Sequence, residues 1–463
     1  MPFVQIPVRP SSGSSLLLIA GLAAFALSVP AIAATAEAGP APAAPTSFKF
    51  DFGAKAAPGY TSVTPATVYS KASGFGFDLG TAPTEVDRGG AEAERDGFVT
   101  SDQPFFFSVA VPEGNYNVTV TLGDARDGSV TTVKSESRRL MLEGVRTAPG
   151  QFVTRTFVAN VRNPRVPPPP KNAPGNDHVE LNDREDGPGG LVLHWDEKLT
   201  LEFNDRRPCV CALTIDRVDD IPTVFLVGDS TMTDQPHEPT TSWGQMLSRF
   251  LKPGVAIANH AESGETMKSF ITELRLDKVL SLMKKGDYLI LQFGHNDSKA
   301  NWPQTYVEAG TTYKAYMKAY IAEVRRRGAT PIIVDPMQRH QFDAQGKVRN
   351  SHGGYPQAVR EVATEEHVPF IDLTAMSVAF YESMGPEKSW AAFSGGKDAT
   401  HHSAYGAYEL AKCIVQGIKD NHLDLANYIV DDFGTFDPAH PDPVASFDVP
   451  PSPGRSTQAP RGN

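Results

Sequence analysis

The chain has 463 residues, with 54 Asp and Glu against 43 Lys and Arg, which gives a formal net charge of −11 at pH 7. A single hydrophobic core stops growing at about 250 to 300 residues, so this length predicts two domains with tails. The negative charge argues against nucleic acid and anionic membrane surfaces as partners, and an acidic protein that acts on a polyacid must gather basic residues near its site.

The first residues are typical of a secretory signal peptide. Arg9 precedes an apolar run from Leu16 to Val29, and residues 31–33 (Ala-Ile-Ala) have the small-x-small form of a cleavage site. The run is shorter than the roughly 20 residues that span a bilayer comfortably. We therefore expect residues 1–33 to be removed, residues 34–46 to form an Ala/Pro linker, and the mature protein to be secreted or periplasmic without membrane contact.

Residues 47–219 contain short runs in which apolar and polar side chains alternate, separated by Gly, Pro, Asn and Asp clusters. A period of two is typical of strands with one buried face. The predicted strands cover residues 48–53, 105–111, 115–122, 138–145, 152–161, 191–203 and 209–218. The pattern predicts an antiparallel β-sandwich domain.

The chain has three cysteines, Cys209, Cys211 and Cys413, so at least one thiol has no disulfide partner. Cys209 and Cys211 lie two residues apart in a predicted strand and therefore point to the same face. We interpret them as buried apolar thiols. Three cysteines alone do not make a zinc site, and we expect no metal and no cofactor.

Residues 220–435 show a different pattern, in which apolar strands alternate with helical spacing. The predicted strands are 223–228, 255–260, 287–293, 330–335 and 368–373, and the predicted helices are 267–284, 311–327, 355–367 and about 403–419. Five apolar strands separated by helices predict an α/β domain with a parallel sheet covered on both faces. Residues 436–463 are Pro-rich and polar, and we expect them to form a disordered tail.

Polar residues stand at the carboxyl ends of these predicted strands. Ser230 follows the first strand, Gly264 follows the second, and Gly-His-Asn-Asp at 294–297 follows the third. Asp-Ala-Thr-His at 398–401 comes just before the last helix. In a doubly wound sheet these loops meet over one crevice.

The residues in these loops can carry out nucleophilic catalysis. The Ser230 hydroxyl needs a base, and the His401 imidazole can take its proton and return it. Asp398 can orient the ring and stabilise the imidazolium. The backbone amides of Ser230 and Gly264 and the side-chain amide of Asn296 can form an oxyanion hole.

Each of these residues also has a simpler interpretation. Ser230 could cap the following helix, and Asp398 could be a loop or cap residue. Gly264 and Asn296 could be turn residues. His402 directly follows His401, which leaves open which of the two histidines acts as the base.

Four sequence blocks in order, GDSTM, NHAESGETMKSF, QFGHND and DATH, resemble the SGNH (GDSL-type) hydrolases, and most of all their rhamnogalacturonan acetylesterase branch. The resemblance covers roughly residues 221–420. It implies a flavodoxin-like three-layer α/β/α fold, with Ser230 as the nucleophile and Asp398 and His401 as its partners. It also implies an oxyanion hole of Ser230, Gly264 and Asn296, and no metal.

We also predict substrate contacts from Asp229, His295 and Arg339; Arg339 could pair with a uronate or could belong to a solvated loop. The N-terminal region resembles the galactose-binding-like β-sandwich that accompanies some of these esterases, through FKFDFG and GYTSVTPATVYS. Its aromatic side chains could hold a polysaccharide or could form the domain core; they include Tyr60, Tyr69 and Phe75.

These patterns together predict a serine esterase that removes acetyl groups from an acetylated plant cell-wall polysaccharide, rhamnogalacturonan (pectin) in particular. A lipase or arylesterase is an alternative, although no long apolar lid is evident. A protein of another class would be a non-catalytic glycan-binding protein with a vestigial serine.

Overall fold

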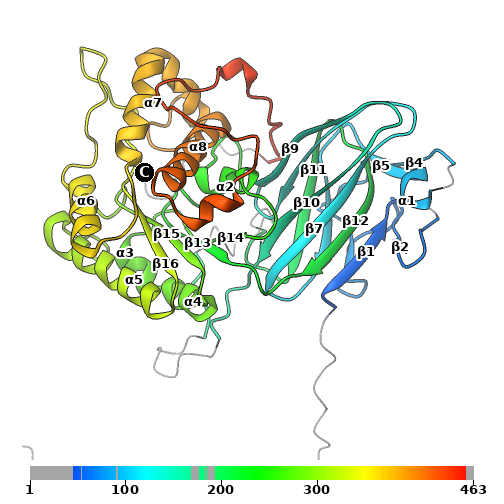
Figure 1. The fold of residues 1–463 in the computed structure, drawn as a ribbon, viewed down its shortest axis with the longest axis horizontal. Helices are drawn as coiled ribbons and strands as arrows, with labels where there is room; N and C mark the ends of the chain where they lie inside the picture. The colour runs from blue at the N-terminus through cyan, green and yellow to red at the C-terminus, as the bar shows by residue number, and fades with distance from the viewer. Residues whose placement is uncertain are drawn as a thin grey trace, which may run out of the picture. The chain divides into compact units, whose positions relative to one another are not determined.

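The computed structural model describes residues 45–53, 55–89, 92–167, 177–182, 185 and 193–454, which belong to one compact unit. The predicted signal peptide, residues 1–33, and all but the last two residues of the predicted linker lie outside the described residues. Within the described part, a β-sandwich is followed by an α/β domain (Figure 1). This arrangement confirms the predicted fold class.

The β-sandwich consists of two sheets whose strand pairs are antiparallel apart from one short parallel pair, β1 with β2. The first sheet has the order β10 (Phe152–Val161), β7 (Gly114–Gly123), β12 (Val210–Arg217), β1 (Ser47–Asp51) and β2 (Thr61–Ser62), with β5 (Gly97–Thr100) joining β12 to β4 (Thr84–Asp87). The second has the order β3 (Phe75–Asp78), β6 (Phe105–Ala110), β11 (Lys198–Arg207), β8 (Ser129–Ser135) and β9 (Arg139–Thr147). A short helix, α1 (Ala93–Asp96), precedes β5.

The sandwich core forms where the inner faces of the two sheets meet. Phe50 of the first sheet packs edge-on against Phe107 of the second, with ring centroids 5.1 Å apart. Cys209 and Cys211 are free and buried next to Phe98, which confirms that they are buried thiols. Phe75 packs against the sandwich core and is only partly buried.

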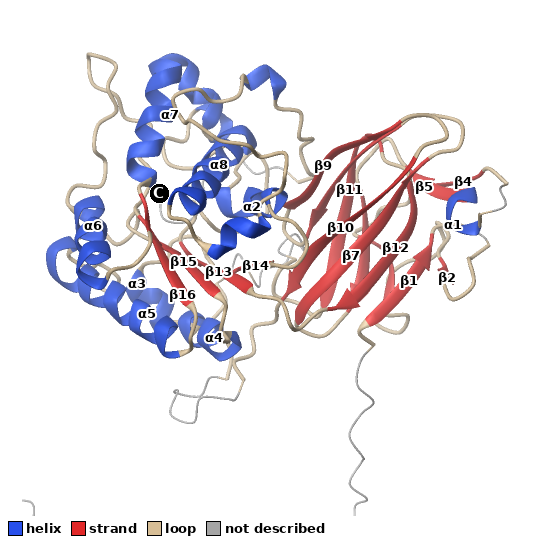
Figure 2. Ribbon diagram, in the orientation of Figure 1, coloured by secondary structure: helices blue, strands red, loops and turns tan. Residues whose placement is uncertain are grey.

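The α/β domain contains five parallel strands in the order β14 (Ala256–Asn259), β13 (Thr223–Gly228), β15 (Tyr288–Gln292), β16 (Thr330–Val334) and β17 (Phe370–Ile371). In chain order this is 2-1-3-4-5, the flavodoxin-like arrangement, so the chain reverses its direction of winding at β13. The helices are α2 (Trp243–Leu247), α3 (Met267–Thr272), α4 (Arg275–Leu282), α5 (Lys314–Arg326), α6 (Tyr355–Glu366), α7 (Leu373–Lys388) and α8 (Ala404–Asp420) (Figure 2).

Both faces of the parallel sheet are covered, because successive side chains of each strand point to opposite sides. Val224 and Leu226 pack in the core that α2, α7 and α8 complete. Phe225 and Val227 pack in the core that α3 to α6 complete. A strand buried on both faces has a continuous apolar sequence, and TVFLV in β13 fits this rule.

The predicted elements differ from the observed ones in a few places. The helix predicted over 267–284 is two helices, because Leu274 adopts a left-handed conformation with φ 60° between α3 and α4. The strand predicted over 191–203 begins only at Lys198, since the Leu193 amide donates to the Ser137 hydroxyl instead of to a neighbouring strand. Among the longer elements, strand β8 and helix α7 were not predicted.

The prediction of a disordered tail over 436–463 is wrong for residues 436–454. Phe447 packs its ring against Tyr408 with centroids 5.4 Å apart. The Ser452 hydroxyl donates to Glu202 at 2.7 Å, and the Ser452 amide donates to Glu238 at 3.1 Å. The segment thus binds to β11 of the sandwich and to the α/β domain, and composition alone could not reveal these buried partners. Residues 455–463 lie outside the described part.

The two domains share a polar interface. Arg138, between β8 and β9, forms an ion pair with Glu238 and donates to the carbonyl groups of Gln235 and Thr240. Arg139 Nε lies 3.0 Å from Asp234 Oδ2. In both pairs the sandwich supplies the arginine and the α/β domain supplies the carboxylate. Separating the domains would leave these buried charges without partners, which is energetically costly.

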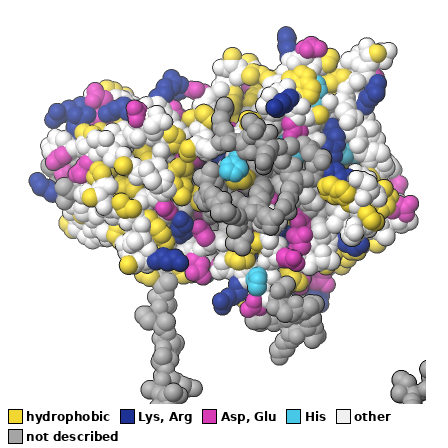
Figure 3. Space-filling model, turned by 180° about the vertical axis from the view of Figure 1, so that it is seen from behind, with side chains coloured by type: hydrophobic (Ala, Val, Ile, Leu, Met, Phe, Trp, Pro, Cys, Tyr) yellow, Lys and Arg dark blue, Asp and Glu magenta, His cyan; other side chains and the backbone are white. Residues whose placement is uncertain are grey.

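Charged side chains of both signs are interspersed over the face that Figure 3 shows, outside the grey residues. The net charge is therefore not concentrated in one area of this face. None of the described helices has the length and apolar composition that crossing a membrane requires.

Candidate active site

The site begins at the turn after β13, at the point where the strand order reverses. Parallel sheets bind ligands at such a switch point, beyond the carboxyl ends of the strands. Gly228 ends the strand, and a Cβ atom there would lie 2.5 Å from the carbonyl oxygen of Gln292. Only glycine fits this close approach of β13 to β15, and Ser230 follows two residues later.

Three predicted residues form a hydrogen-bonded chain at this edge. His401 Nε2 lies 2.8 Å from Ser230 Oγ, and His401 Nδ1 lies 2.9 Å from Asp398 Oδ2. The other carboxylate oxygen of Asp398 accepts the backbone amides of Thr400 and His401. Partial burial acts to raise the pKa of Asp398, but the His401 ring and these amides hold it well below its usual value. An ionised Asp398 fixes the ring with Nε2 directed at the hydroxyl.

The structure also distinguishes the two adjacent histidines. His402 Nε2 lies 2.7 Å from the Tyr381 hydroxyl. Burial lowers the pKa of His402 to about 3, so its ring stays neutral. His401 therefore contacts the serine, as the family resemblance implied, and His402 packs in the interior.

The predicted oxyanion donors follow three neighbouring strands. Gly264 lies in the loop after β14 with φ 88°, a conformation that favours glycine. The Glu262 amide donates to the Gly228 carbonyl at 3.1 Å, which joins this loop to the turn before Ser230. The side-chain amide of Asn296 donates one N–H to the Glu265 carbonyl at 3.0 Å, so its second N–H is available. The assignment of Ser230, Gly264 and Asn296 as an oxyanion hole stays a prediction.

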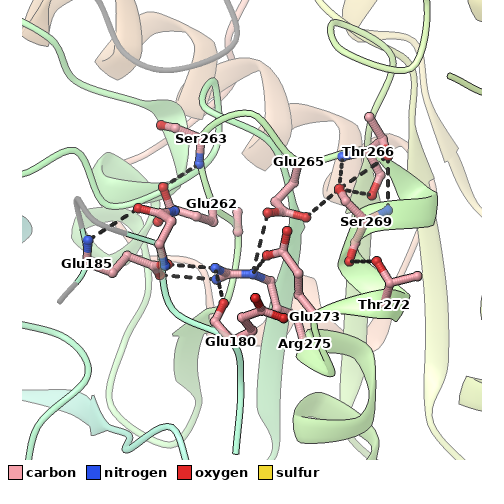
Figure 4. Close-up of polar contacts among 12 residues, drawn as sticks. Glu180, Glu185, Glu262, Ser263, Glu265, Thr266, Ser269, Thr272, Glu273 and Arg275 are labelled. Atoms are coloured by element: carbon pink, nitrogen blue, oxygen red, sulfur yellow. Dashed lines mark hydrogen bonds and ion pairs between the residues drawn. The ribbon is translucent and has the colours of Figure 1, made fainter. Parts of the chain in front are cut away.

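A buried ion network supports the loop that carries Gly264 (Figure 4). Arg275 binds Glu185 with both Nη atoms, at 2.6 and 3.1 Å, and its Nε lies 2.9 Å from Glu273 and 3.5 Å from Glu265. Glu265 also accepts the Ser269 hydroxyl at 2.7 Å. Because Glu265 directly follows Gly264, this network fixes the backbone at the predicted oxyanion position.

One group in the described residues could supply metal ligands. Glu185, His194 and Glu262 are buried, and their ligand atoms lie within 4.8 Å of one another. However, Glu185 is paired with Arg275 and accepts the Trp195 indole N–H at 2.7 Å. An arginine already satisfies the carboxylate that a cation would need, so the arrangement gives no support for a metal role.

Asp229 and His295 were predicted to contact substrate, and both are fully buried. Asp229 accepts the amide and hydroxyl of Thr231, and its other oxygen lies 3.3 Å from His295 Nδ1. Burial acts to raise the pKa of Asp229, but His295 and the Thr231 bonds outweigh it and hold the pKa at about 2. Asp229 therefore holds the turn that contains Ser230, and the predicted contacts of Asp229 and His295 with substrate stay predictions.

Arg339, the third predicted contact residue, lies beside the hydrogen-bonded chain. Its guanidinium donates to the Thr400 hydroxyl and, at 3.3 Å, to the His295 carbonyl. It thus joins the loop that carries His401 to the loop that carries Asn296. Partial burial lowers the pKa of Arg339, and arginine stays charged at neutral pH.

Sequence reasoning missed two contributors. Arg275 stands inside a predicted helix, where its burial has no sequence signal. Lys299 lies three residues after Asn296, and its amide donates to the Asn296 carbonyl at 3.0 Å. The position of Lys299 in the same loop as a predicted site residue could have drawn attention to it.

Known proteins share this combination of domains. Residues 226–407 match the GDSL-like Lipase/Acylhydrolase family, and residues 48–142 match the Beta-agarase/YXIM esterase-like, galactose-binding domain-like family. The rhamnogalacturonan acetylesterase RhgT of Bacillus subtilis is 38% identical over 221 residues, which are 45% of this chain and 94% of that protein. The uncharacterized esterase YxiM of the same organism is 28% identical over 393 residues, covering 81% of this chain and 92% of that protein. A crystal structure of the YxiM protein aligns over 82% of this chain and 99% of that one, at 25% identity and a TM-score of 0.43.

The hydrogen-bonded serine, histidine and aspartate at the switch point agree with these matches. A chain that covers nearly all of a relative at 38% identity shares its family. This protein therefore belongs to the GDSL-like lipase/acylhydrolase (SGNH) family of serine carboxylic ester hydrolases and carries an N-terminal galactose-binding-like domain.

Proposed function

We propose that this esterase removes O-acetyl groups from a plant cell-wall polysaccharide, with rhamnogalacturonan, the branched region of pectin, as the substrate. The observation that carries the proposal is the chain from Asp398 through His401 to Ser230, with contacts of 2.9 and 2.8 Å. A relative named as a rhamnogalacturonan acetylesterase supports the choice of polymer.

In the proposed mechanism, Ser230 Oγ attacks the acetyl carbonyl while His401 Nε2 takes the hydroxyl proton. The negative charge that forms on the carbonyl oxygen is stabilised by the amides of Ser230 and Gly264 and the side chain of Asn296. The bond between the acetyl carbon and the sugar oxygen then breaks, His401 gives its proton to that oxygen to form the sugar hydroxyl, and the acetyl group stays on Ser230. Water, deprotonated by His401, attacks this ester and releases acetate, and the proton returns to Ser230.

Two other functions, a lipase or arylesterase and a non-catalytic glycan-binding protein, fit the site less well. A lipase or arylesterase uses the same chemistry, but the loops around Ser230 are rich in charged and polar side chains, including Arg339 and Lys299. A glycan-binding protein without activity has no need of a histidine aimed at a serine hydroxyl. The polysaccharide esterase accounts for both the polar surroundings and the aimed base.

We also propose that the mature protein is secreted or periplasmic, because the proposed substrate is extracellular and residues 1–33 resemble a signal peptide. The galactose-binding-like domain would then hold the polymer near the site.

The test is acetate release from acetylated rhamnogalacturonan and acetylated xylan by the wild type and by Ser230→Ala. Release from the pectic polymer that disappears in the variant supports both the nucleophile and the substrate. Equal activity on xylan widens the substrate to acetylated glycans in general. A wild type that binds these polymers but frees no acetate overturns the polysaccharide esterase.

A further inference from the structure

Two cations stand at the carboxyl edge of the sheet without an acidic partner among the described residues. Arg339 follows β16, and Lys299 lies in the loop after β15. Within that part of the chain, the hydrogen bonds of the Arg339 guanidinium go to Thr400 and to the carbonyl of His295, and neither group is acidic. These two contacts use two of the five guanidinium N–H groups and leave the others for a ligand.

Lys299 is the more unusual of the pair. Its ammonium nitrogen is enclosed, and no described residue accepts a hydrogen bond from it. The nitrogen lies 4.3 Å from the centre of the Trp302 ring. Burial and the charge of Arg339 lower the pKa of Lys299 to about 8, and the negative charge of Asp229, which forms no ion pair with Lys299, opposes this only in part. An enclosed ammonium without an acceptor is costly, so a protein that keeps one gains from a ligand that supplies the acceptor.

Other enclosed cations of this chain do have acidic partners. Lys278 Nζ lies 2.6 Å from Glu113 Oε1, and Lys134 Nζ lies 3.6 Å from Glu202 Oε1. Arg275 binds the Glu185 carboxylate. The chain carries 11 more acidic than basic residues, so acidic partners are abundant. Lys299 and Arg339 differ from these cations, and they lie beside the predicted catalytic residues.

Both cations are tied to those residues. Arg339 binds Thr400, whose amide donates to Asp398. Lys299 is joined by its backbone to Asn296. Arg339 is thus bound to the loop that supplies the base His401, and Lys299 lies in the loop that supplies the predicted oxyanion donor Asn296.

We propose that Lys299 and Arg339 together bind a carboxylate of the substrate, so that the polysaccharide carries uronic acid residues next to the acetylated sugar. This inference rests on the proposed function and adds to it the two residues that recognise the carboxylates of the polymer. Arg339 offers a planar fork of N–H groups that matches a carboxylate. Lysine has a flexible stem, so the Lys299 ammonium can turn from the Trp302 ring to the second carboxylate oxygen.

The experiment compares four substrates with the full-length mature protein. They are acetylated rhamnogalacturonan, the same polymer with its carboxyl groups reduced to primary alcohols, acetylated xylan, and p-nitrophenyl acetate. The variants are Lys299→Met and Arg339→Gln. The matched control is Lys285→Met, which removes the same charge from an exposed position before β15, at the opposite edge of the sheet.

Lys299→Met should raise KM on the native polymer about tenfold, the effect of one lost charge-assisted hydrogen bond. It should leave kcat/KM on the reduced polymer and on p-nitrophenyl acetate unchanged, because neither carries a carboxylate. Arg339→Gln should also raise KM on the native polymer. Because Arg339 binds Thr400 next to His401, the rate of this variant on p-nitrophenyl acetate shows whether the substitution also disturbs His401. Added salt should raise KM on the native polymer and not on the reduced one.

Equal effects of Lys299→Met on the native and reduced polymers would overturn the carboxylate site, as would no effect on either. A wild type that deacetylates xylan and the reduced polymer as well as the native one also overturns it and leaves the polysaccharide esterase standing. A wild type that hydrolyses p-nitrophenyl acetate but no polymer overturns the proposed function and the carboxylate site together.

Discussion

His401 Nε2 and Ser230 Oγ lie 2.8 Å apart although 171 residues separate them in the chain. The contact forms because Ser230 follows the strand at the switch point and His401 precedes α8, which packs with α2 on one face of the same sheet. The core of that face thus sets the distance between the base and the hydroxyl.

The adjacent histidines give a matched pair of variants. His401→Asn should lower kcat by at least about 10³-fold, because the base is lost. His402→Asn should keep kcat within about tenfold of the wild type, since His402 contacts Tyr381 and not Ser230. The measurement is kcat on p-nitrophenyl acetate together with the thermal midpoint, which shows whether either variant is misfolded. A larger kcat loss in a folded His402→Asn would reverse the assignment of the base.

Asn296→Ala should lower kcat by about 10² to 10³-fold with little change in KM, the usual result of removing one oxyanion donor. The donor acts on charge that exists only in the transition state. Asn296→Asp is the informative companion, because a carboxylate of similar shape cannot donate and would repel the oxyanion. If both variants change KM and spare kcat, Asn296 binds the ground state instead.

Arg275→Met should destabilise the fold by about 3 to 5 kcal/mol, since it leaves the buried carboxylates of Glu185 and Glu265 without their cation. Arg275→Lys should be milder in stability but still lower kcat, because lysine cannot bind Glu185 with two parallel hydrogen bonds and the Gly264 loop loses support. Thermal midpoints and kcat well below each midpoint measure the two effects. The exposed pair of Arg326 with Glu323 is the control, and Arg326→Met should change stability by less than about 1 kcal/mol. Normal kcat in Arg275→Lys would separate this network from catalysis.

Asp229 should make stability depend on acidity. Its pKa in the folded protein is about 2, below the ordinary 3.8, so the ionised form stabilises the fold above about pH 4. This contribution, about 2 kcal/mol for a fully buried group, is lost as the pH falls through 4 toward 2. The stability difference between the wild type and Asp229→Asn should therefore be full at pH 6 and shrink at lower pH. A difference that stays constant from pH 6 to pH 3 would mean that the substitution costs stability through shape and not through charge.

The ordered segment after residue 436 should contribute to stability. A chain ending at residue 436 loses the packing of Phe447 and leaves Lys134 without the Pro450 carbonyl and the Ser452 hydroxyl. Buried polar groups left without partners cost about 1 to 3 kcal/mol each, so unfolding should shift to lower temperature and denaturant concentration. A chain ending at residue 454 is the control and should unfold like the full protein. Equal stability of the two truncated chains would contradict the role of this segment.

Much of the fold could be predicted from two patterns, namely the alternation of apolar and polar residues in the sandwich and the apolar strands separated by helical spacing in the α/β domain. The β13 prediction, residues 223–228, matched the observed strand, because a continuous apolar run between turn residues has few other uses. Apolar spacing continues through Leu274 and therefore predicts one helix over 267–284, because spacing does not report a left-handed residue. The polar composition after residue 436 predicts disorder for a related reason, because composition does not report the partners of this segment on β11 and α8.

The sequence by itself determined the residue types and their order, namely a serine after the first strand, an amide after the third and an Asp-x-x-His before the last helix. It also placed them at strand ends, because periodicity depends on local residue order. Only the tertiary structure decided that His401 and not His402 faces the serine, that Asp229 lies next to His295, and that no described acidic group forms an ion pair with Lys299 or Arg339. Those properties depend on which side chains become neighbours when distant segments pack, and no local pattern carries that information.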